Sequence, residues 1–147
     1  MDKRQELQKI CKENNIVLAY LFGSQVETGL NLLNGKKQEL TDPLADIDVG
    51  VIFRTPLPGP KDRFLLYSKI YNQLEDLFIP YPLDLVFLQE THSVFQANAV
   101  CGQCIYYEDL QYKEAYEENI LRFAADFRPF LDKYYDEILE EVPHAHR

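Results

Sequence analysis

Basic side chains, cysteines and long apolar runs are all scarce in this chain of 147 residues. Lys and Arg number 15 against 24 Asp and Glu, which gives a formal net charge of -9. A protein that holds duplex nucleic acid mainly through its phosphates needs the opposite charge balance. We therefore expect no direct nucleic-acid partner.

The shortage of apolar runs and cysteines indicates where the protein works. The strongest apolar segment, LFIPYPLDLVFL, is broken by two prolines and an aspartate, and the opening MDKRQELQKI has no apolar stretch behind it. These patterns predict neither a membrane span nor a signal peptide. The three cysteines, Cys11, Cys101 and Cys104, are a small and odd set for a disulfide framework. We expect a cytoplasmic protein with reduced thiols.

Hydrophobic residues, in contrast, make up 46% of the chain, and charged residues make up 27%. Without any low-complexity tract, this composition predicts a single folded domain over residues 1–147. Acidity is concentrated late, because residues 61–147 hold 16 acidic and 8 basic side chains, against 8 and 7 in residues 1–60. An anionic ligand is therefore expected in the first part, while the acidic, tyrosine-rich later part suits a basic partner protein.

Short apolar segments that alternate with helical patterns predict an α/β (α+β) fold with a small sheet of about three or four strands. Residues 31–44 are polar, contain Gly and Pro, and are expected to form a surface loop. The expected strands are 16–22 (IVLAYLF), 46–53 (DIDVGVIF) and 83–88 (LDLVFL), and the expected helices are 2–14, a short one from Ser24, 61–78, 91–100 and about 111–139.

Two of these helices carry apolar residues at helical spacing. In the helix at 61–78 they include Phe64, Tyr67 and Leu74, and in the C-terminal helix they recur from Tyr112 to Ile138. Such stripes predict helices that cover a core. Pro129 lies inside the second stripe, where it should bend or split the helix.

Asp46 and Asp48 open the second strand. Side chains two apart in a strand point the same way, roughly 6.6 Å apart along the chain, so both carboxylates can reach one metal ion. The structural alternative is that the two acids merely sit at a solvated strand end.

Asp84 lies inside the apolar segment LDLVFL. An ionised carboxylate is costly to bury there unless it is paired, exposed at a strand end or bound to a cation. If the strands at 46–53 and 83–88 are neighbours, three carboxylates meet on one sheet face. Mg²⁺ or Mn²⁺ is the usual remedy for their repulsion, and such sites handle phosphates.

Gly23 and Ser24 stand between the first strand and the start of a helix. Gly23 lets the backbone come close to a ligand, and free amides at a helix amino end, with the Ser24 hydroxyl, suit a phosphate group. Ser24 and Glu27 also fit a capping pair, which would satisfy Ser24 without any ligand.

The order of these motifs resembles the nucleotidyltransferase superfamily that includes polymerase β, and within it the minimal nucleotidyltransferases that act as antitoxins to HEPN toxins. The segments that carry the resemblance are LFGSQVETG (21–29), ADIDVGVIF (45–53) and PLDLVFL (82–88). The resemblance implies a nucleotidyltransferase fold with a mixed sheet flanked by helices and a long C-terminal helix.

The resemblance also implies site residues and chemistry. Asp46 and Asp48 match the metal-binding aspartates, Asp84 matches the acid that completes the site and helps deprotonate the acceptor, and Gly23 and Ser24 match the pair that grips the triphosphate. The implied activity is Mg²⁺-dependent transfer of AMP from ATP to a hydroxyl, with a tyrosine of a cognate HEPN toxin as acceptor.

Two alternatives remain open. Family members usually have a basic residue shortly after Gly-Ser, whereas this chain has Gln25, Val26 and Glu27, so it could neutralise a partner by binding, with weak or no catalysis. Lys36, Lys37, Arg54, Lys61 or Arg63 could compensate for the missing charge. Transfer to a small-molecule alcohol is the other alternative, although it usually needs a larger second domain.

Overall fold

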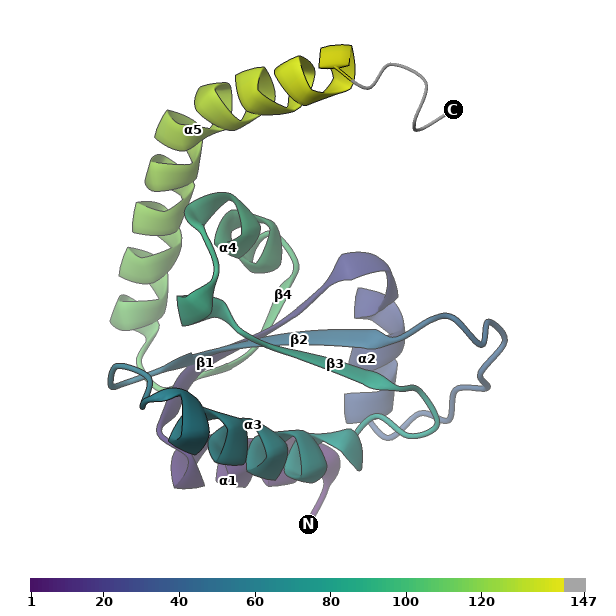
Figure 1. The fold of residues 1–147 in the computed structure, drawn as a ribbon. Helices are drawn as coiled ribbons and strands as arrows, with labels where there is room; N and C mark the ends of the chain where they lie inside the picture. Colours follow the sequence, from purple (N-terminus) through teal and green to yellow (C-terminus); the bar gives the residue numbers. More distant parts are fainter. Residues whose placement is uncertain (142–147) are drawn as a thin grey trace.

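A mixed sheet of four strands forms the centre of the protein. The computed structural model describes residues 1–141 (Figure 1). The strand order is β3-β2-β1-β4, in which β2 runs parallel to β3 and antiparallel to β1, and β4 pairs antiparallel with the other edge of β1. The strands are β1 (Ile16–Phe22), β2 (Ile47–Phe53), β3 (Leu83–Phe87) and β4 (Gln103–Tyr107).

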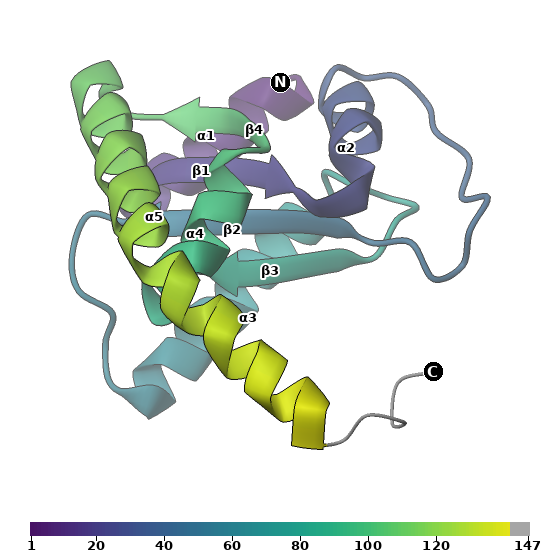
Figure 2. The ribbon, with the colours of Figure 1, turned by 90° about the horizontal axis from the view of Figure 1, so that it is seen from above.

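Helices cover the two faces of the sheet differently (Figures 1 and 2). α1 (Lys3–Glu13) and α3 (Pro60–Glu75) lie on one face, and α4 (Ser93–Val100) and α5 (Leu110–Glu141) lie on the other. The short α2 (Val26–Leu33) follows β1 through a 3-10 turn, and a second such turn follows β3. Within residues 1–141, no helix is both long and apolar enough to cross a membrane.

Alternation along the central strands divides the core into two clusters. Ile47, Val49 and Val51 of β2 face α1 and α3 in the larger cluster. Ile52 faces the opposite way, with Leu18 and Tyr20 of β1, in a smaller cluster beneath α4. The α4 side of the sheet is therefore less extensively covered than the α1 and α3 side.

The fold class expected from the sequence is confirmed, and β1 matches its expected range. Most other bounds differ from the expected ones by one or two residues, including β2, which begins at Ile47 and not at Asp46. Three details differ more. α2 continues to Leu33, into the expected loop, because Leu32 and Leu33 are buried. α3 ends at Glu75, and Phe64, expected on its core face, is 69% exposed. The fourth strand, β4, falls in a segment where no strand was placed.

The first half of α5 is anchored to the sheet and to α4 by hydrogen bonds. The Tyr20 hydroxyl donates a hydrogen bond to Glu117 Oε2 at 2.7 Å, and the Tyr116 hydroxyl donates one to Gln96 Oε1 of α4 at 2.6 Å. Ala124 is the last buried residue among the α5 side chains described.

Part of the apolar stripe of α5 does not cover the core as predicted. The helix continues through Pro129 and bends, so that its last part passes above α4 at a distance from the sheet (Figure 1). Phe123 and Phe127, both in the stripe, are 60% and 42% exposed. The side chains of Leu131, Tyr134 and Ile138 lie outside those described.

Candidate active site at the start of β2 and β3

The parallel pairing of β2 and β3 brings two of the three aspartates side by side. Asp48 lies directly opposite Asp84 in the register of the two strands. Ile47 and Val49 point into the larger core cluster, so Asp48, between them, points to the α4 side. Asp84 points the same way, because its neighbours Leu83 and Leu85 belong to that cluster. Asp46, predicted to open the strand, lies just before β2, and the three acids meet at the end of the sheet where β2 and β3 begin.

The spacing of the three carboxylates suits a cation. One oxygen from each of Asp46, Asp48 and Asp84 lies within 4.8 Å of the other two. Oxygens on opposite sides of one Mg²⁺ are about 4.2 Å apart, and hard divalent cations take carboxylate ligands. The donor set and its spacing therefore fit a divalent cation after small side-chain rotations.

The same proximity perturbs the ionisation of Asp48. Burial, a hydrogen bond with the Asp84 carboxyl and the negative charges of Asp46 and Asp84 together raise the pKa of Asp48 to about 7. The protein thus retains a proton among these acids well above the ordinary range of a carboxyl group. A bound cation would take the place of that proton.

The turn after β1 is fitted against Asp48. Phe22, the last residue of β1, pairs with Asp48 across the sheet. Gly23 follows with φ +75°, a conformation that favours glycine. A Cβ atom at position 23 would lie 2.1 Å from Asp48 Oδ2. The structure therefore places the exposed backbone of Gly23 beside the acidic cluster.

Ser24 is exposed and does not cap α2. The residues Gly23–Gln25 form the 3-10 turn, and the position preceding α2 is Gln25, which makes no side-chain capping bond. The expected Ser24 and Glu27 capping pair is wrong, because the turn moves the helix start to Val26. The Ser24 hydroxyl is left accessible at the same end of the sheet as the three aspartates.

Five basic residues were considered as replacements for the basic residue missing after Gly23 and Ser24, and two of them form ion pairs away from the acidic cluster. Arg54, beyond the opposite end of β2, pairs with Glu108, and Arg63 pairs with Glu90 at 3.1 Å. Across residues 1–141, no Lys or Arg forms an ion pair with the three aspartates.

Two contacts that support this edge were not expected from the sequence. The Phe95 ring of α4 packs edge-on against Phe22, with centroids 5.7 Å apart. Gly102 packs against β1 so closely that a Cβ atom there would lie 2.1 Å from the Leu21 carbonyl oxygen. The sequence signal for this contact is the glycine itself, which lies between Cys101 and Cys104.

Comparison with known proteins agrees with this geometry. A family model described as polymerase β, nucleotidyltransferase, matches residues 5–111. No curated protein matches the sequence.

Solved structures resemble the whole described fold. A chain of a mutant MntA-HpeT toxin-antitoxin has a TM-score of 0.64 and 18% identity, over 92% of this chain and 98% of that chain. A toxin-antitoxin structure with AMP-PNP has a TM-score of 0.63 and 18% identity, over 92% of this chain and 98% of that chain. The structure of a tri-AMPylated Shewanella oneidensis HEPN toxin in complex with MNT antitoxin has a TM-score of 0.61 and 18% identity, over 93% of this chain and 96% of that chain.

Proposed function

The chain belongs to the polymerase β nucleotidyltransferase family, and from this premise we propose that it transfers AMP from ATP to a protein hydroxyl. The observation that carries the proposal is the meeting of Asp46, Asp48 and Asp84 beside the exposed turn at Gly23. A three-carboxylate cluster next to free backbone amides suits a cation-bound triphosphate.

In this proposal Asp46, Asp48 and Asp84 hold Mg²⁺ or Mn²⁺, and Gly23 and Ser24 bind the triphosphate. Divalent cations bound there would neutralise phosphate charge and stabilise the attacking and leaving oxygens of an in-line displacement. The positive φ of Gly23 turns the chain sharply at the end of β1, so the amides of the 3-10 turn can face a phosphate without obstruction by a side chain. The exposed Ser24 hydroxyl adds a donor.

Asp84 is proposed as the group that accepts the acceptor's proton. It is the exposed member of the cluster, whereas Asp46 and Asp48 are half-buried. The acceptor oxygen attacks the α-phosphorus, the bond from that phosphorus to the bridging oxygen breaks, and pyrophosphate leaves. The proton of the hydroxyl passes to Asp84, and AMP stays on the acceptor.

The proposed acceptor is a tyrosine of a cognate HEPN toxin, which would make this chain an antitoxin. The support is the Shewanella oneidensis complex, where a HEPN toxin is tri-AMPylated and bound to an MNT antitoxin of similar fold. Modification by this chain would then silence the toxin.

AMP transfer from labelled ATP to a HEPN protein from the same genome tests the proposal. We expect Mg²⁺-dependent label on the HEPN protein, lost in Asp48→Asn because the cluster loses a charged ligand. Asp62→Asn, on α3 across the sheet, is the matched control and should keep full activity. Transfer by Asp48→Asn at the wild-type rate would contradict the assignment.

A second candidate function is neutralisation by binding alone. Glu27 in the first turn of α2, together with the engagement of Arg54 and Arg63 elsewhere, favours it. Calorimetry with Mg·ATP separates the two functions, because the enzyme should bind the nucleotide and a binding-only protein should not.

A further inference from the structure

The middle of α5, from Leu121 to Phe127, carries exposed apolar side chains on both of its flanks. Phe123 and Phe127 lie on one flank, beside Ser93 of α4, around a hollow of about 360 Å³. Leu121, 46% exposed, lies on the other flank. We define these three residues and Ala125 as the α5 ridge. Isolated exposed apolar residues are ordinary, but several within two turns of one helix, each set beside a hollow against α4, favour a contact surface.

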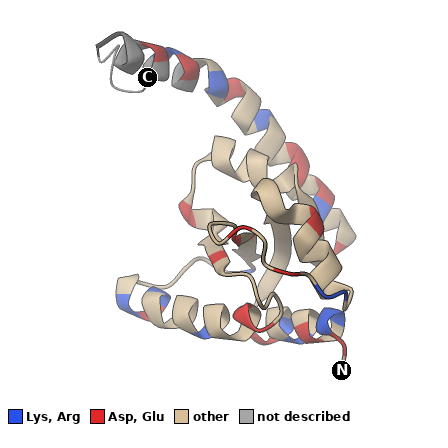
Figure 3. Ribbon diagram, turned by 90° about the vertical axis from the view of Figure 1, so that its right-hand side faces the viewer, with Lys and Arg blue, Asp and Glu red and all other residues tan. Residues whose placement is uncertain are grey.

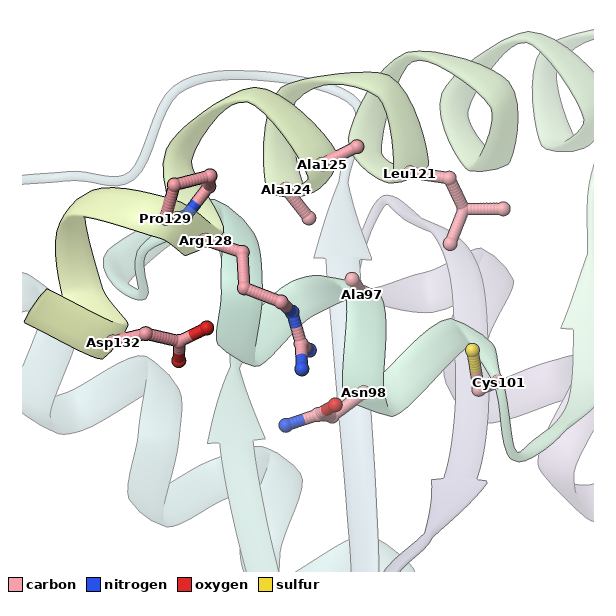
Figure 4. Close-up of a pocket in the computed structure, with 9 residues that line it drawn as sticks. All are labelled: Ala97, Asn98, Cys101, Leu121, Ala124, Ala125, Arg128, Pro129 and Asp132. Carbon is pink, nitrogen blue, oxygen red and sulfur yellow. The ribbon is translucent and has the colours of Figure 1, made fainter.

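A groove of about 500 Å³ separates this ridge from α4 on the Leu121 side (Figure 4). Small side chains, including Ala97 and Ala125, line it and leave space for larger side chains of another molecule. Arg128 reaches from α5 toward Asn98 of α4 (Figure 4). Among the side chains that the structure describes, no carboxylate pairs with Arg128, although Asp132 is one helical turn away. The groove therefore offers apolar contacts and one free cationic donor.

The ridge is connected to the candidate active site through α4. Ser93, beside Phe123 and Phe127, is two residues from Phe95, whose ring packs on Phe22. Cys101, at the far end of the groove, adjoins Gly102, which packs against Leu21 and Phe22. Since Phe22 precedes the Gly23 turn, α4 bridges the ridge and the acidic cluster on one side of the sheet.

The charge of α5 indicates what binds the ridge. Residues 110–141 hold nine Asp and Glu against four Lys and Arg, and acidic positions are distributed along the helix (Figure 3). A partner with apolar side chains bordered by basic ones complements this surface. A nucleotide does not, because its phosphates would be repelled.

We propose that the α5 ridge and its groove are the docking surface for the protein acceptor, a basic-faced protein whose apolar side chains cover Phe123, Phe127 and Leu121. The inference rests on the proposed function for the identity of the acceptor. Docking there would keep the acceptor on the side of the sheet to which Asp48 and Asp84 point.

The test uses the full chain and a purified HEPN protein from the same genome. The variant is Phe123→Ser/Phe127→Ser, and because both side chains are exposed, the fold should survive. The matched control is Phe64→Ser/Leu65→Ser, which removes side chains that are 69% and 57% exposed on α3, across the sheet. Calorimetry measures the Kd for the HEPN protein and, separately, the Kd for Mg·ATP.

We expect the Phe123→Ser/Phe127→Ser variant to bind the HEPN protein at least about tenfold more weakly, because apolar anchors dominate such interfaces. Its Mg·ATP affinity should stay within about twofold of wild type, and the control should change neither value. Equal HEPN affinity of wild type and variant would overturn the docking surface. The docking surface would also be overturned if the wild type forms dimers in sedimentation equilibrium, the variant does not, and HEPN binding is unchanged. Failure of the wild type to bind Mg·ATP would contradict the proposed function instead.

Discussion

Gly23 and Asp48 lie so close together that no side chain fits between them. A Cβ atom at position 23 would meet Asp48 Oδ2, which is the end of a side chain that can rotate away. The close approach therefore controls where the carboxylate points more than it controls stability. Gly35 provides a comparison, because it also has positive φ, but a Cβ atom there would meet nothing within 4 Å.

We expect Gly23→Ala to displace the Asp48 carboxylate. Both Gly23→Ala and Gly35→Ala should lose about 1–2 kcal/mol in the free energy of unfolding, from an L side chain in the left-handed region. Gly23→Ala alone should also weaken Mn²⁺ binding at least about tenfold, since ligand geometry is lost. Urea unfolding and Mn²⁺ calorimetry measure the two effects. Unchanged Mn²⁺ affinity in Gly23→Ala would show that this contact does not position Asp48.

The raised pKa of Asp48 gives the metal-free protein a distinct pH dependence. The unfolded chain releases this proton near pH 4, whereas the folded chain keeps it until about pH 7. The folded state thus binds more protons in between, and stability falls as pH rises from 4 to 7. Because Asp48 is only half-buried, solvent screening should limit the loss to about 1 kcal/mol.

Urea unfolding in EDTA at several pH values measures this loss. Asp48→Asn should remove it, so the stability difference between wild type and variant should change between pH 4 and pH 7. Mg²⁺ at pH 7.5 should restore wild-type stability, because it binds the folded state. Parallel pH profiles for the two proteins would contradict the raised pKa.

At the scale of elements, continuous apolar runs were easy to place from the sequence. IVLAYLF is fully buried except at Phe22, so its composition alone marks β1. The sequence also placed the three aspartates correctly relative to each other once β2 and β3 were taken as neighbours. Their parallel register, with Asp48 opposite Asp84, is a property of the assembled sheet and has no local signal.

β4 and the exposure of Phe123 and Phe127 on α5 could not be predicted from the sequence, for different reasons. β4 is a five-residue edge strand with two buried residues, Ile105 and Tyr106, so it has too short a pattern to recognise. α5 has a clear apolar stripe, but that pattern cannot tell whether the stripe faces the core or another molecule. Phe123 and Phe127 follow the stripe and are nevertheless exposed.

The attachment of α5 depends on a hydrogen bond from a buried tyrosine. Tyr20 is 1% exposed, and its hydroxyl donates to Glu117 Oε2. Burial, this bond and nearby negative charge raise the pKa of Tyr20, so the hydroxyl stays protonated and able to donate. We expect Tyr20→Phe to cost about 1 kcal/mol in the free energy of unfolding, because the half-buried Glu117 loses this donor and keeps only the Lys113 ammonium, 3.2 Å away.

Tyr107→Phe is the control for this substitution. Tyr107 is 49% exposed, and its replacement should change the free energy of unfolding by less than about 0.5 kcal/mol. Urea unfolding compares the two variants. Equal stabilities would show that the Tyr20 to Glu117 bond does not hold α5 in place.

At the scale of the whole molecule, one face of the sheet carries the larger core cluster and the other carries the acidic cluster. α1 and α3 close one face over the larger core cluster, which supplies stability. The other face carries the acidic cluster at its edge and, beyond α4, the projecting half of α5 (Figures 1 and 2). A fold closed on one side and accessible on the other suits an enzyme whose acceptor is a macromolecule.

Anomalous diffraction from crystals grown with Mn²⁺ and a non-hydrolysable ATP analogue tests the central claim most directly. We expect Mn²⁺ peaks in contact with carboxylate oxygens of Asp46, Asp48 and Asp84, and the triphosphate against the backbone of Gly23 and Ser24. Manganese and nucleotide bound elsewhere on the protein, with the three carboxylates vacant, would contradict the account.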